Sequence, residues 1–229
     1  MIVPLISDDT WKMALEEEPI WNPPMNRAVI VAPHPDDETL GAGGLITTLR
    51  RRDVETTVVA VTDGENAYEA ASNLGSTRSR EQEEALQVLG VDPGHIIRLG
   101  LPDRYVSEHE AELIDKLLPL IDSDCHLVAP WTGDFHPDHE ACGRAAKEIA
   151  HRTGASLSFY FFWTWHRGEP EILKGLTLRR LPLDSMALHF KEGALRRHRS
   201  QLSHPSGEPI LPDYLLGPIR WPFEVFATE

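Results

Sequence analysis

Two short clusters of histidine and acidic residues are the part of this chain best suited to chemistry. The first runs His34-Pro35-Asp36-Asp37-Glu38, and the second, about a hundred residues later, runs His136-Pro137-Asp138-His139. Imidazole and carboxylate donors suit a divalent transition metal, and a catalytic zinc ion typically takes three protein ligands and keeps one position open. Two histidines and one carboxylate would complete such a site, taken from His34, from Asp36 or Asp37, and from His136 or His139. The carboxylate and imidazole left over suit the proton transfers of a hydrolase.

Each cluster directly follows an apolar run, at 28–32 and 126–129, that predicts a buried strand. Two further strands are predicted at 57–61 and 96–99, with helices near 39–52, 77–89, 108–121 and 138–152. Alternating strands and helices imply parallel strands joined by right-handed crossovers, and ligands bind at the carboxyl ends of such strands. The sequence therefore predicts an α/β protein with a Rossmann-like three-layer fold, a mostly parallel sheet, and the metal site at the carboxyl ends of its strands.

The two ends of the chain lack this alternation. Residues 1–26 predict an N-terminal extension packed on the domain, and the pattern changes again after residue 156. A strand-like aromatic run at 157–165, a shorter strand at 177–181, a helix at 185–201 and a proline-rich surface loop at 205–222 are predicted there. We expect residues 156–229 to shape the entrance of the pocket, within a single domain spanning residues 1–229. The proline-rich loop also leaves room for a homo-oligomer, because it could dock on a second copy of the chain.

Composition narrows the classes of protein that need to be considered. The formal charge of −14 argues against a nucleic-acid partner, which calls for basic patches. The longest apolar and aromatic stretch is too short to span a bilayer, and the N-terminus has no signal-peptide pattern. Cys125 and Cys142 form no CxxC pair and predict buried free thiols in a reducing compartment. These features predict a cytoplasmic protein with no nucleic-acid partner and no membrane span.

The two clusters resemble the paired signatures of the LmbE-like, PIG-L-type zinc N-deacetylases. That family removes acetyl groups from N-acetylglucosamine units, and the likeness covers residues 27–151, with a weaker echo in 191–201. The resemblance implies a zinc-dependent hydrolase of a linear amide bond, acting on a small, N-acetylated, sugar-containing molecule. By position it implies His34, Asp37 and His139 as the ligands of Zn²⁺, with Fe²⁺ as the alternative ion.

The same resemblance implies catalytic roles for Asp36, His136 and Asp138. Asp36 would act as general base on zinc-bound water as it attacks the acetyl carbonyl. His136 would stabilise the tetrahedral oxyanion, with an imidazolium as one option, and Asp138 would hydrogen-bond His136 and hold its orientation. A helper tyrosine that some relatives carry just before the second cluster is missing, because Gly133-Asp134-Phe135 stands there. The proton donor to the leaving nitrogen therefore stays open between Asp36 and His136.

Three residues are candidates for holding the substrate. Arg78 resembles the arginine of the family's R-x-x-E helix, which reaches a substrate hydroxyl or phosphate; the alternative is an i,i+3 pair with Glu81 on a solvated face. Asp103 resembles a strand-end acid that accepts hydrogen bonds from sugar hydroxyls, and the alternative is a plain turn residue. Trp131 is the first choice for stacking on a sugar ring, because it follows the fourth strand. A core position is the alternative for Trp131 and equally for the other tryptophans weighed, Trp163, Trp165 and Trp221.

Other functions fit the same residues less well. A dinucleotide site would need glycine where Ile46 stands, so the glycines of residues 41–44 are better explained by close packing of a helix on the sheet. Two histidines and a carboxylate also bind iron in non-haem oxygenases, but Asp36 and the pair of His136 and Asp138 would have no use there. A hydrolase of a non-sugar amide and a non-catalytic metal-binding module are the remaining alternatives.

Overall fold

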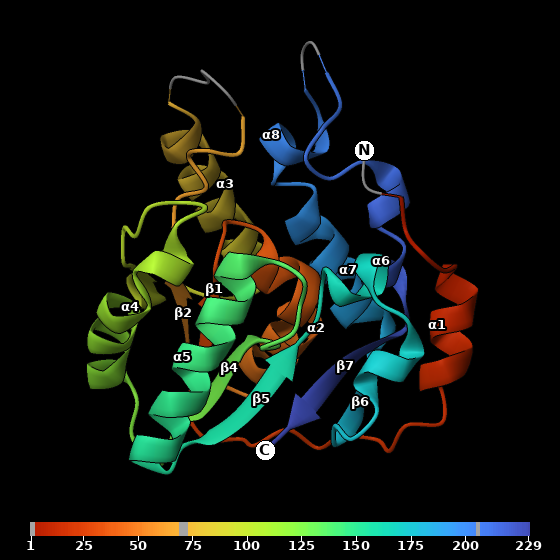
Figure 1. Cartoon of the computed structure of the whole chain (residues 1–229), viewed down its shortest axis with the longest axis horizontal. Coiled ribbons are helices and arrows are strands. Elements are labelled where there is room, and N and C mark those ends of the chain that lie inside the picture. Colours follow the sequence, from red (N-terminus) through yellow and green to blue (C-terminus); the bar gives the residue numbers. More distant parts are fainter. Residues whose placement is uncertain (1–2, 69–72, 205–206) are drawn as a thin grey trace.

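A single mixed sheet forms the centre of the computed structural model, which describes residues 3–68, 73–204 and 207–229 (Figure 1). Its seven strands lie in the order β3-β2-β1-β4-β5-β7-β6. The strands are β1 (Ala28–Ala32), β2 (Thr56–Ala60), β3 (Ile96–Arg98), β4 (His126–Pro130), β5 (Ser156–Tyr160), β6 (Leu178–Pro182) and β7 (Phe223–Thr228). The α-helices are α1 (Asp8–Leu15), α2 (Asp37–Arg50), α3 (Leu74–Val88), α4 (Glu110–Leu117), α5 (Pro137–Thr153), α6 (Thr164–Arg167), α7 (Ser185–Leu195) and α8 (Arg199–Leu202).

The direction of the strands fixes where a ligand can bind. Strands β1 to β5 are parallel, whereas β7 runs antiparallel to both β5 and β6. The chain passes from β1 to β2 and β3 on one side and then to β4 and β5 on the other. The neighbours β1 and β4 therefore mark the point where strand order reverses, and ligands of open α/β sheets bind at the carboxyl ends there. The predicted α/β fold with a mostly parallel sheet is confirmed.

Two layers of helices cover the sheet, and the alternating side chains of β1 show which helices face which side. Val29 and Val31 belong to a core with residues of α1, α4 and α5. Ala28, Ile30 and Ala32 belong to a second core with residues of α2, α3 and α7. Figure 1 shows α4 and α5 together on one side of the sheet. Because both faces are covered, β1 is a continuous apolar run and not an alternating one.

Gly41 lets α2 approach the sheet closely. A β-carbon at this position would lie 2.1 Å from Cδ2 of Tyr160, which is far closer than such atoms can approach. Tyr160, on β5, donates its hydroxyl hydrogen to the carbonyl oxygen of Val31 at 2.9 Å. The expectation that the glycines of residues 41–44 serve close helix packing is therefore confirmed at Gly41, and this packing helps to set where α2 lies relative to β1.

The regions without regular alternation differ most from the prediction. The helix predicted at 108–121 shortens to α4 between two 3₁₀ turns, because Pro119 lies in the second turn. The aromatic run 157–165 divides into the end of β5 and the start of α6, and the helix predicted at 185–201 breaks into α7 and α8. The loop predicted at 205–222 contains two 3₁₀ turns, and its residues 205–206 lie outside the described part of the chain. The final strand, β7, was not predicted.

The N-terminal segment packs on the C-terminal part of the chain. Trp11, on α1, lies edge to face against Trp165 with ring centroids 5.0 Å apart, and its indole N–H donates to the carbonyl oxygen of Trp165 at 2.9 Å. Cys125 and Cys142 are buried free thiols, as predicted. Within residues 3–68, 73–204 and 207–229, no helix has both the length and the apolar character needed to cross a membrane.

Candidate metal and active site

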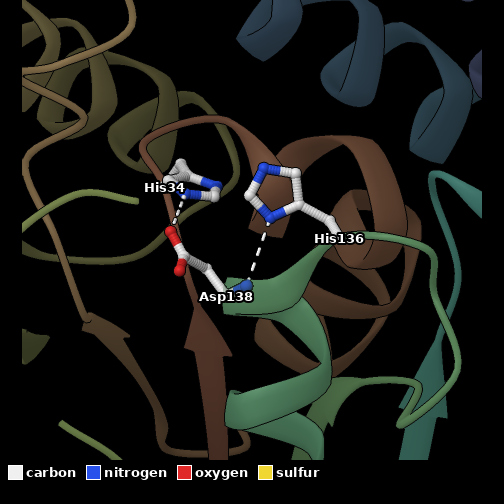
Figure 2. Close-up of side chains that lie close together, drawn as sticks. All are labelled: His34, His136 and Asp138. Carbon is white, nitrogen blue, oxygen red and sulfur yellow. Dashed lines mark hydrogen bonds and ion pairs between the residues drawn. The ribbon is translucent and has the colours of Figure 1, made fainter. Parts of the chain in front are cut away.

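The two predicted clusters meet at the carboxyl ends of β1 and β4. His34 lies in the loop between β1 and α2, and His136 lies directly before α5. The ring centroids of His34 and His136 are 5.0 Å apart, and those of His34 and His139 are 5.5 Å apart. Figure 2 shows the rings of His34 and His136 next to each other, with Asp138 on the first turn of α5 close to both. Residues that are a hundred positions apart in the chain therefore form one site.

The local sequence explains why α5 begins at this point. His136 has an extended backbone, and its Nδ1 accepts a hydrogen bond from the backbone N–H of Asp138 at 3.3 Å, so it caps the helix. Pro137 takes the first helical position, where its missing N–H has no partner to lose. Asp138 and Glu140 lie in the first turn, near the positive end of the helix dipole. This start places His136, Asp138 and His139 within one turn beside β1.

Three donors lie close enough together to hold one metal ion. The donor atoms of His34, Asp37 and His139 all lie within 4.8 Å of one another. Oδ2 of Asp37 is 3.1 Å from Nδ1 of His34 and 3.2 Å from Nε2 of His139. Nε2 of His139 is buried, and within the described residues its contact with Oδ2 of Asp37 is close but lacks good hydrogen-bond geometry. Two imidazoles and a carboxylate arranged in this way fit a divalent transition-metal ion.

Asp138 lies at the site but makes a different contact from the one expected. Its Oδ2 is 3.1 Å from Nε2 of His34 and accepts the backbone N–H of Arg104 at 2.9 Å, and its Oδ1 accepts the N–H of Val106 at 3.1 Å. Within the described residues, the bond between the two runs from the backbone N–H of Asp138 to Nδ1 of His136 in place of the expected side-chain hydrogen bond. The physical reason is that the loop after β3 offers two N–H groups, which hold the carboxylate toward His34. A ring nitrogen of His136, a ring nitrogen of His34 and a carboxylate oxygen of Asp138 nevertheless lie within 4.8 Å of one another, so these three are a second set of donors that could hold a metal ion.

Asp134 is a functional candidate that the sequence interpretation missed. Its side chain is fully buried, and its Oδ2 lies 2.8 Å from Nδ1 of His139. The carboxylate also accepts the backbone N–H groups of Phe162, Trp163 and Thr164, and the hydroxyl of Thr164 at 2.6 Å. A carboxylate on the far nitrogen of a ligand histidine fixes the tautomer that leaves Nε2 free for a metal. The available signal was an acidic residue in the segment Gly133-Asp134-Phe135, between β4 and the second cluster.

Asp36 and Asp37 are adjacent, yet their surroundings drive their pKa values in opposite directions. Burial, followed by the negative charge of Asp37, raises the pKa of Asp36 well above its usual value, while Arg78, whose Nη2 is 3.8 Å from Oδ2, opposes the rise. Burial would also raise the pKa of Asp37, but the charges and hydrogen bonds of His139 and His34 outweigh it and hold this pKa well below the usual value. A carboxylate that stays ionised suits a metal ligand, whereas one that can hold a proton suits acid–base chemistry.

The surroundings of His136 favour its neutral imidazole. Burial, followed by the positive charges of His139 and His34, lowers the pKa of His136 to about 3. Its ring stacks on Trp163, with centroids 5.9 Å apart and ring planes 17° apart. Because Nδ1 accepts the N–H of Asp138, the proton of the neutral ring lies on Nε2. The structure therefore disfavours the imidazolium that was one option for this residue.

A cavity of about 170 Å³ opens beside the cluster. Its polar lining consists of His34, Asp36, Asp37, Arg78, Asp103, Arg104 and His136, and its apolar lining of Ala67, Phe162, Trp163, Ile210 and Leu211. Two of the three residues predicted to hold substrate, Arg78 and Asp103, thus lie at the cavity. Oδ1 of Asp103 is 3.3 Å from Nε2 of His34, and Oδ2 accepts the backbone N–H of Asn66 at 2.9 Å.

Trp131, the tryptophan predicted to stack on substrate, does not line this cavity. Its backbone N–H donates to the carbonyl oxygen of Tyr160 at 2.9 Å, so it continues the pairing of β4 with β5 by one residue. The period of two along a strand then places its ring on the face covered by α5, 5.6 Å from the ring of Phe161. Trp163, a less favoured candidate than Trp131 in the sequence analysis, lines the cavity instead. The guanidinium of Arg167 lies 4.6 Å from the centroid of the Trp163 ring.

Comparisons with known proteins show the family of this chain. Residues 29–150, more than half of the chain, match the family described as PIG-L: GlcNAc-PI de-N-acetylase. The chain is 26% identical over 220 residues to a probable N-acetyl-alpha-D-glucosaminyl L-malate deacetylase 2 of Bacillus subtilis (strain 168), covering 86% of this chain and 96% of that protein. It is 31% identical over 177 residues to a 1D-myo-inositol 2-acetamido-2-deoxy-alpha-D-glucopyranoside deacetylase of Mycobacterium sp. (strain KMS), covering 65% of this chain and 57% of that protein.

Solved structures share the fold. An N,N'-diacetylchitobiose deacetylase from Pyrococcus horikoshii is similar with a TM-score of 0.61 and 24% identity, covering 83% of this chain and 72% of that chain. The teicoplanin deacetylase Orf2 is similar with a TM-score of 0.69 and 16% identity, covering 88% of this chain and 97% of that chain. At these identities the likeness shows the fold alone. The matched residues 29–150 contain both His/Asp clusters, and on this ground the chain belongs to the PIG-L family.

Proposed function

We propose that the protein is a metal-dependent N-deacetylase that removes an acetyl group from an amino-sugar conjugate. One observation carries this proposal: three donors that fit a divalent ion, His34, Asp37 and His139, adjoin a cavity that also contains a fourth group, Asp36, suited to proton transfer. Membership of the PIG-L family supports the same activity, because relatives are named as deacetylases of N-acetylglucosamine conjugates. Zn²⁺ is the proposed ion, and Fe²⁺ is the alternative that the same donors accept.

In this proposal the three donors hold the ion, which when bound polarises a carbonyl oxygen and makes a water molecule more acidic. Asp36 receives the proton of the water molecule whose oxygen attacks the acetyl carbon. Arg78, 3.8 Å away, favours the ionised form of Asp36 that this step needs. When the C–N bond breaks, the proton passes from Asp36 to the leaving nitrogen, so the products are acetate and the free amine.

His136 is proposed to stabilise the oxygen that becomes negative. Its Nε2–H can donate a hydrogen bond to that oxygen, and such a donor acts most strongly in a cavity with little water. The low pKa of His136, about 3, favours a ring without a second proton to give to the leaving nitrogen. We therefore propose that Asp36 returns the proton, the alternative that the sequence left open being His136.

The lining of the cavity supports a sugar-containing substrate. An amino sugar has apolar ring faces and polar edges, and aromatic side chains combined with a few polar groups recognise this combination. Trp163 and Phe162 supply aromatic surface, and Asp103 supplies carboxylate oxygens that suit sugar hydroxyls. We therefore propose an N-acetylglucosamine conjugate as the substrate, with a non-sugar amide as the alternative.

Release of acetate tests this function directly. Zn²⁺-loaded wild type, Asp36→Asn and the control Asp115→Asn, on an exposed position of α4, are incubated with N-acetylglucosamine, N,N'-diacetylchitobiose and N-acetylglucosaminyl L-malate. We expect acetate from the wild type and the control, loss of activity after chelation, and a kcat lowered at least about 100-fold in Asp36→Asn with metal still bound.

Two outcomes would contradict parts of the proposal. Wild-type kcat in Asp36→Asn would show that this residue is not the general base. No acetate from any of the sugars, with one equivalent of metal bound, would contradict the sugar deacetylase and direct the search to non-sugar amides. Consumption of dioxygen by the Fe²⁺-loaded protein would support the oxygenase.

A further inference from the structure

Asp36 carries its carboxyl group on a backbone conformation that residues other than glycine rarely adopt. Its φ is 140° and its ψ is −28°, directly before the first residue of α2. Such a conformation is strained and persists only where the surroundings hold it. On the helix side, the carbonyl oxygen of Asp36 accepts the N–H groups of Thr39 and Leu40, both at 2.9 Å. The contacts on the other side, at Pro35, come from distant parts of the chain.

Two buried side chains converge on the carbonyl oxygen of Pro35. Nε2 of Gln201, on α8, donates to this oxygen at 2.6 Å, and Nη2 of Arg78, on α3, donates to it at 3.2 Å. The same Nη2 also donates to Oε1 of Gln201 at 2.9 Å, so the three groups close a triangle. Gln201 is 0% exposed and Arg78 is 3% exposed. Buried groups that satisfy one another in this way hold a single arrangement.

Arg78 connects these three groups to the carboxylate of Asp36. Nη1 of Arg78 donates to the carbonyl oxygen of Gly64 at 2.9 Å, and Nη2 lies 3.8 Å from Oδ2 of Asp36. Protein oxygen atoms thus accept both hydrogens of Nη2 and one hydrogen of Nη1, whereas Nε has no hydrogen-bond partner among the described residues. Arg78 is therefore held beside Asp36 by the protein, while the predicted contact with a substrate hydroxyl or phosphate stays a prediction.

His198 also contacts the side-chain amide of Gln201. Its Nδ1 is 3.2 Å from Nε2 of Gln201, and its Nε2 is 3.3 Å from the hydroxyl oxygen of Thr39 in the first turn of α2. His198 is also fully buried. The segment around α8 therefore contacts the peptide before Asp36 and the helix turn after it.

We propose that Gln201 is a positioning residue for Asp36, and that α8 thereby fixes the general base from the C-terminal part of the chain. The inference rests on the proposed function of Asp36. Gln201 is not among the residues that line the cavity or that could hold the metal ion, so its influence passes through Pro35 and Arg78. A base displaced by about 1 Å can lose about 100-fold in rate, whereas substrate affinity depends on other contacts.

The test compares Gln201→Met, which keeps the chain length but removes the side-chain hydrogen bonds to Pro35, Arg78 and His198, with Gln87→Met on an exposed position of α3. Acetate release is measured with full-length, Zn²⁺-loaded protein and whichever of the three sugars the wild type cleaves. We expect kcat to fall about 10- to 100-fold in Gln201→Met, with KM within twofold, one equivalent of metal retained, and Gln87→Met unchanged. A kcat within twofold of the wild type, or a loss that appears in KM or metal content instead, would overturn the proposal.

A double-mutant cycle with Asp36→Asn separates positioning from a general loosening of the site. If Gln201 acts through Asp36, Gln201→Met lowers the residual kcat of Asp36→Asn by less than twofold. A general loosening would lower it as much as it lowers the wild type, and this would overturn the proposal. Gln201→Glu serves as a second variant, because it keeps an acceptor for Arg78 but cannot donate to Pro35; we expect its kcat to fall as well.

A readout independent of activity distinguishes this proposal from the proposed function. In a crystal structure of Gln201→Met, we expect the φ of Asp36 to leave its value near 140°, or its carboxylate to be disordered. An unchanged, ordered Asp36 would overturn the positioning role even if no substrate had been found. A wild type that cleaves none of the sugars would instead contradict the proposed function and would not bear on this conformation.

Discussion

Asp134 offers the sharpest prediction, because one buried carboxylate orients a proposed metal ligand. In Asp134→Asn, the N–H and hydroxyl of Thr164, which both donate to Oδ1, select the amide oxygen for that position. The NH₂ group then takes the position of Oδ2, where it meets the N–H of Trp163 and donates to Nδ1 of His139. The ring proton of His139 must therefore move to Nε2, and a protonated nitrogen cannot ligate a metal ion.

We expect Asp134→Asn to weaken Zn²⁺ affinity by about 10- to 100-fold, the range found when such partners of ligand histidines are changed. This corresponds to about 1.4 to 2.7 kcal/mol of binding free energy. Competition with a chromophoric chelator at neutral pH measures the affinity, with Asp115→Asn as the exposed control. Thermal unfolding of the metal-free proteins shows whether the variant still folds. A folded variant whose Zn²⁺ affinity lies within twofold of the wild type would refute the argument from the tautomer.

Packing, burial and the cavity lining each support a further prediction. Gly41→Ala should lower the free energy of unfolding in urea by about 2 kcal/mol, because its β-carbon would overlap the ring of Tyr160; an unchanged midpoint would contradict this. Burial lowers the pKa of His126 to about 4, so the stability that its neutral form contributes is complete above pH 6.5 and is lost as the pH falls toward 4. Between neutral pH and pH 4.5, the free energy of unfolding in urea should therefore fall by about 2.5 kcal/mol more in the wild type than in His126→Phe. Trp163→Ala should raise KM for the cleaved sugar about 10-fold, whereas Trp131→Ala should leave KM unchanged, and equal effects would show that the cavity is not the substrate site.

The strands from β1 to β5 could be predicted because each is a short apolar run between polar or glycine-containing segments. Their order along the chain also forces parallel pairing, since each crossover carries a helix or helical turn. The strand β7 was missed although its run Phe223–Thr228 is rich in aromatic and β-branched residues that favour strands. Its antiparallel pairing with Leu178–Pro182 of β6 and with β5 joins distant segments, and local patterns do not reveal such pairing.

The site could be predicted as far as its histidines and adjacent acids, because clusters at the ends of parallel strands must lie together. The partner of each carboxylate could not be predicted. Asp134 depends on four donors in residues 162–164, and Asp138 depends on the backbone N–H groups of the loop after β3, so both follow from how loops fold and not from spacing. The error at Trp131 is different, because the period of two from Leu127 and Ala129 already indicates the core side of the sheet.

The residues of the cavity wall come from two parts of the chain, one inside and one outside the stretch that matches the family. All the donors that fit a metal ion, together with Asp36, lie inside residues 29–150, whereas Phe162, Trp163, Ile210 and Leu211 lie outside them. The proposed metal ligands and general base therefore come from the matched stretch of sequence, whereas the cavity wall combines residues of that stretch with residues from the C-terminal part of the chain. Under the proposed function, we expect substitutions of Phe162, Trp163, Ile210 and Leu211 to change substrate preference and to leave the proposed metal ligands in place. Gln201 limits such changes, because its side chain must keep donating a hydrogen bond to the carbonyl oxygen of Pro35 if the proposed positioning of Asp36 is to be preserved.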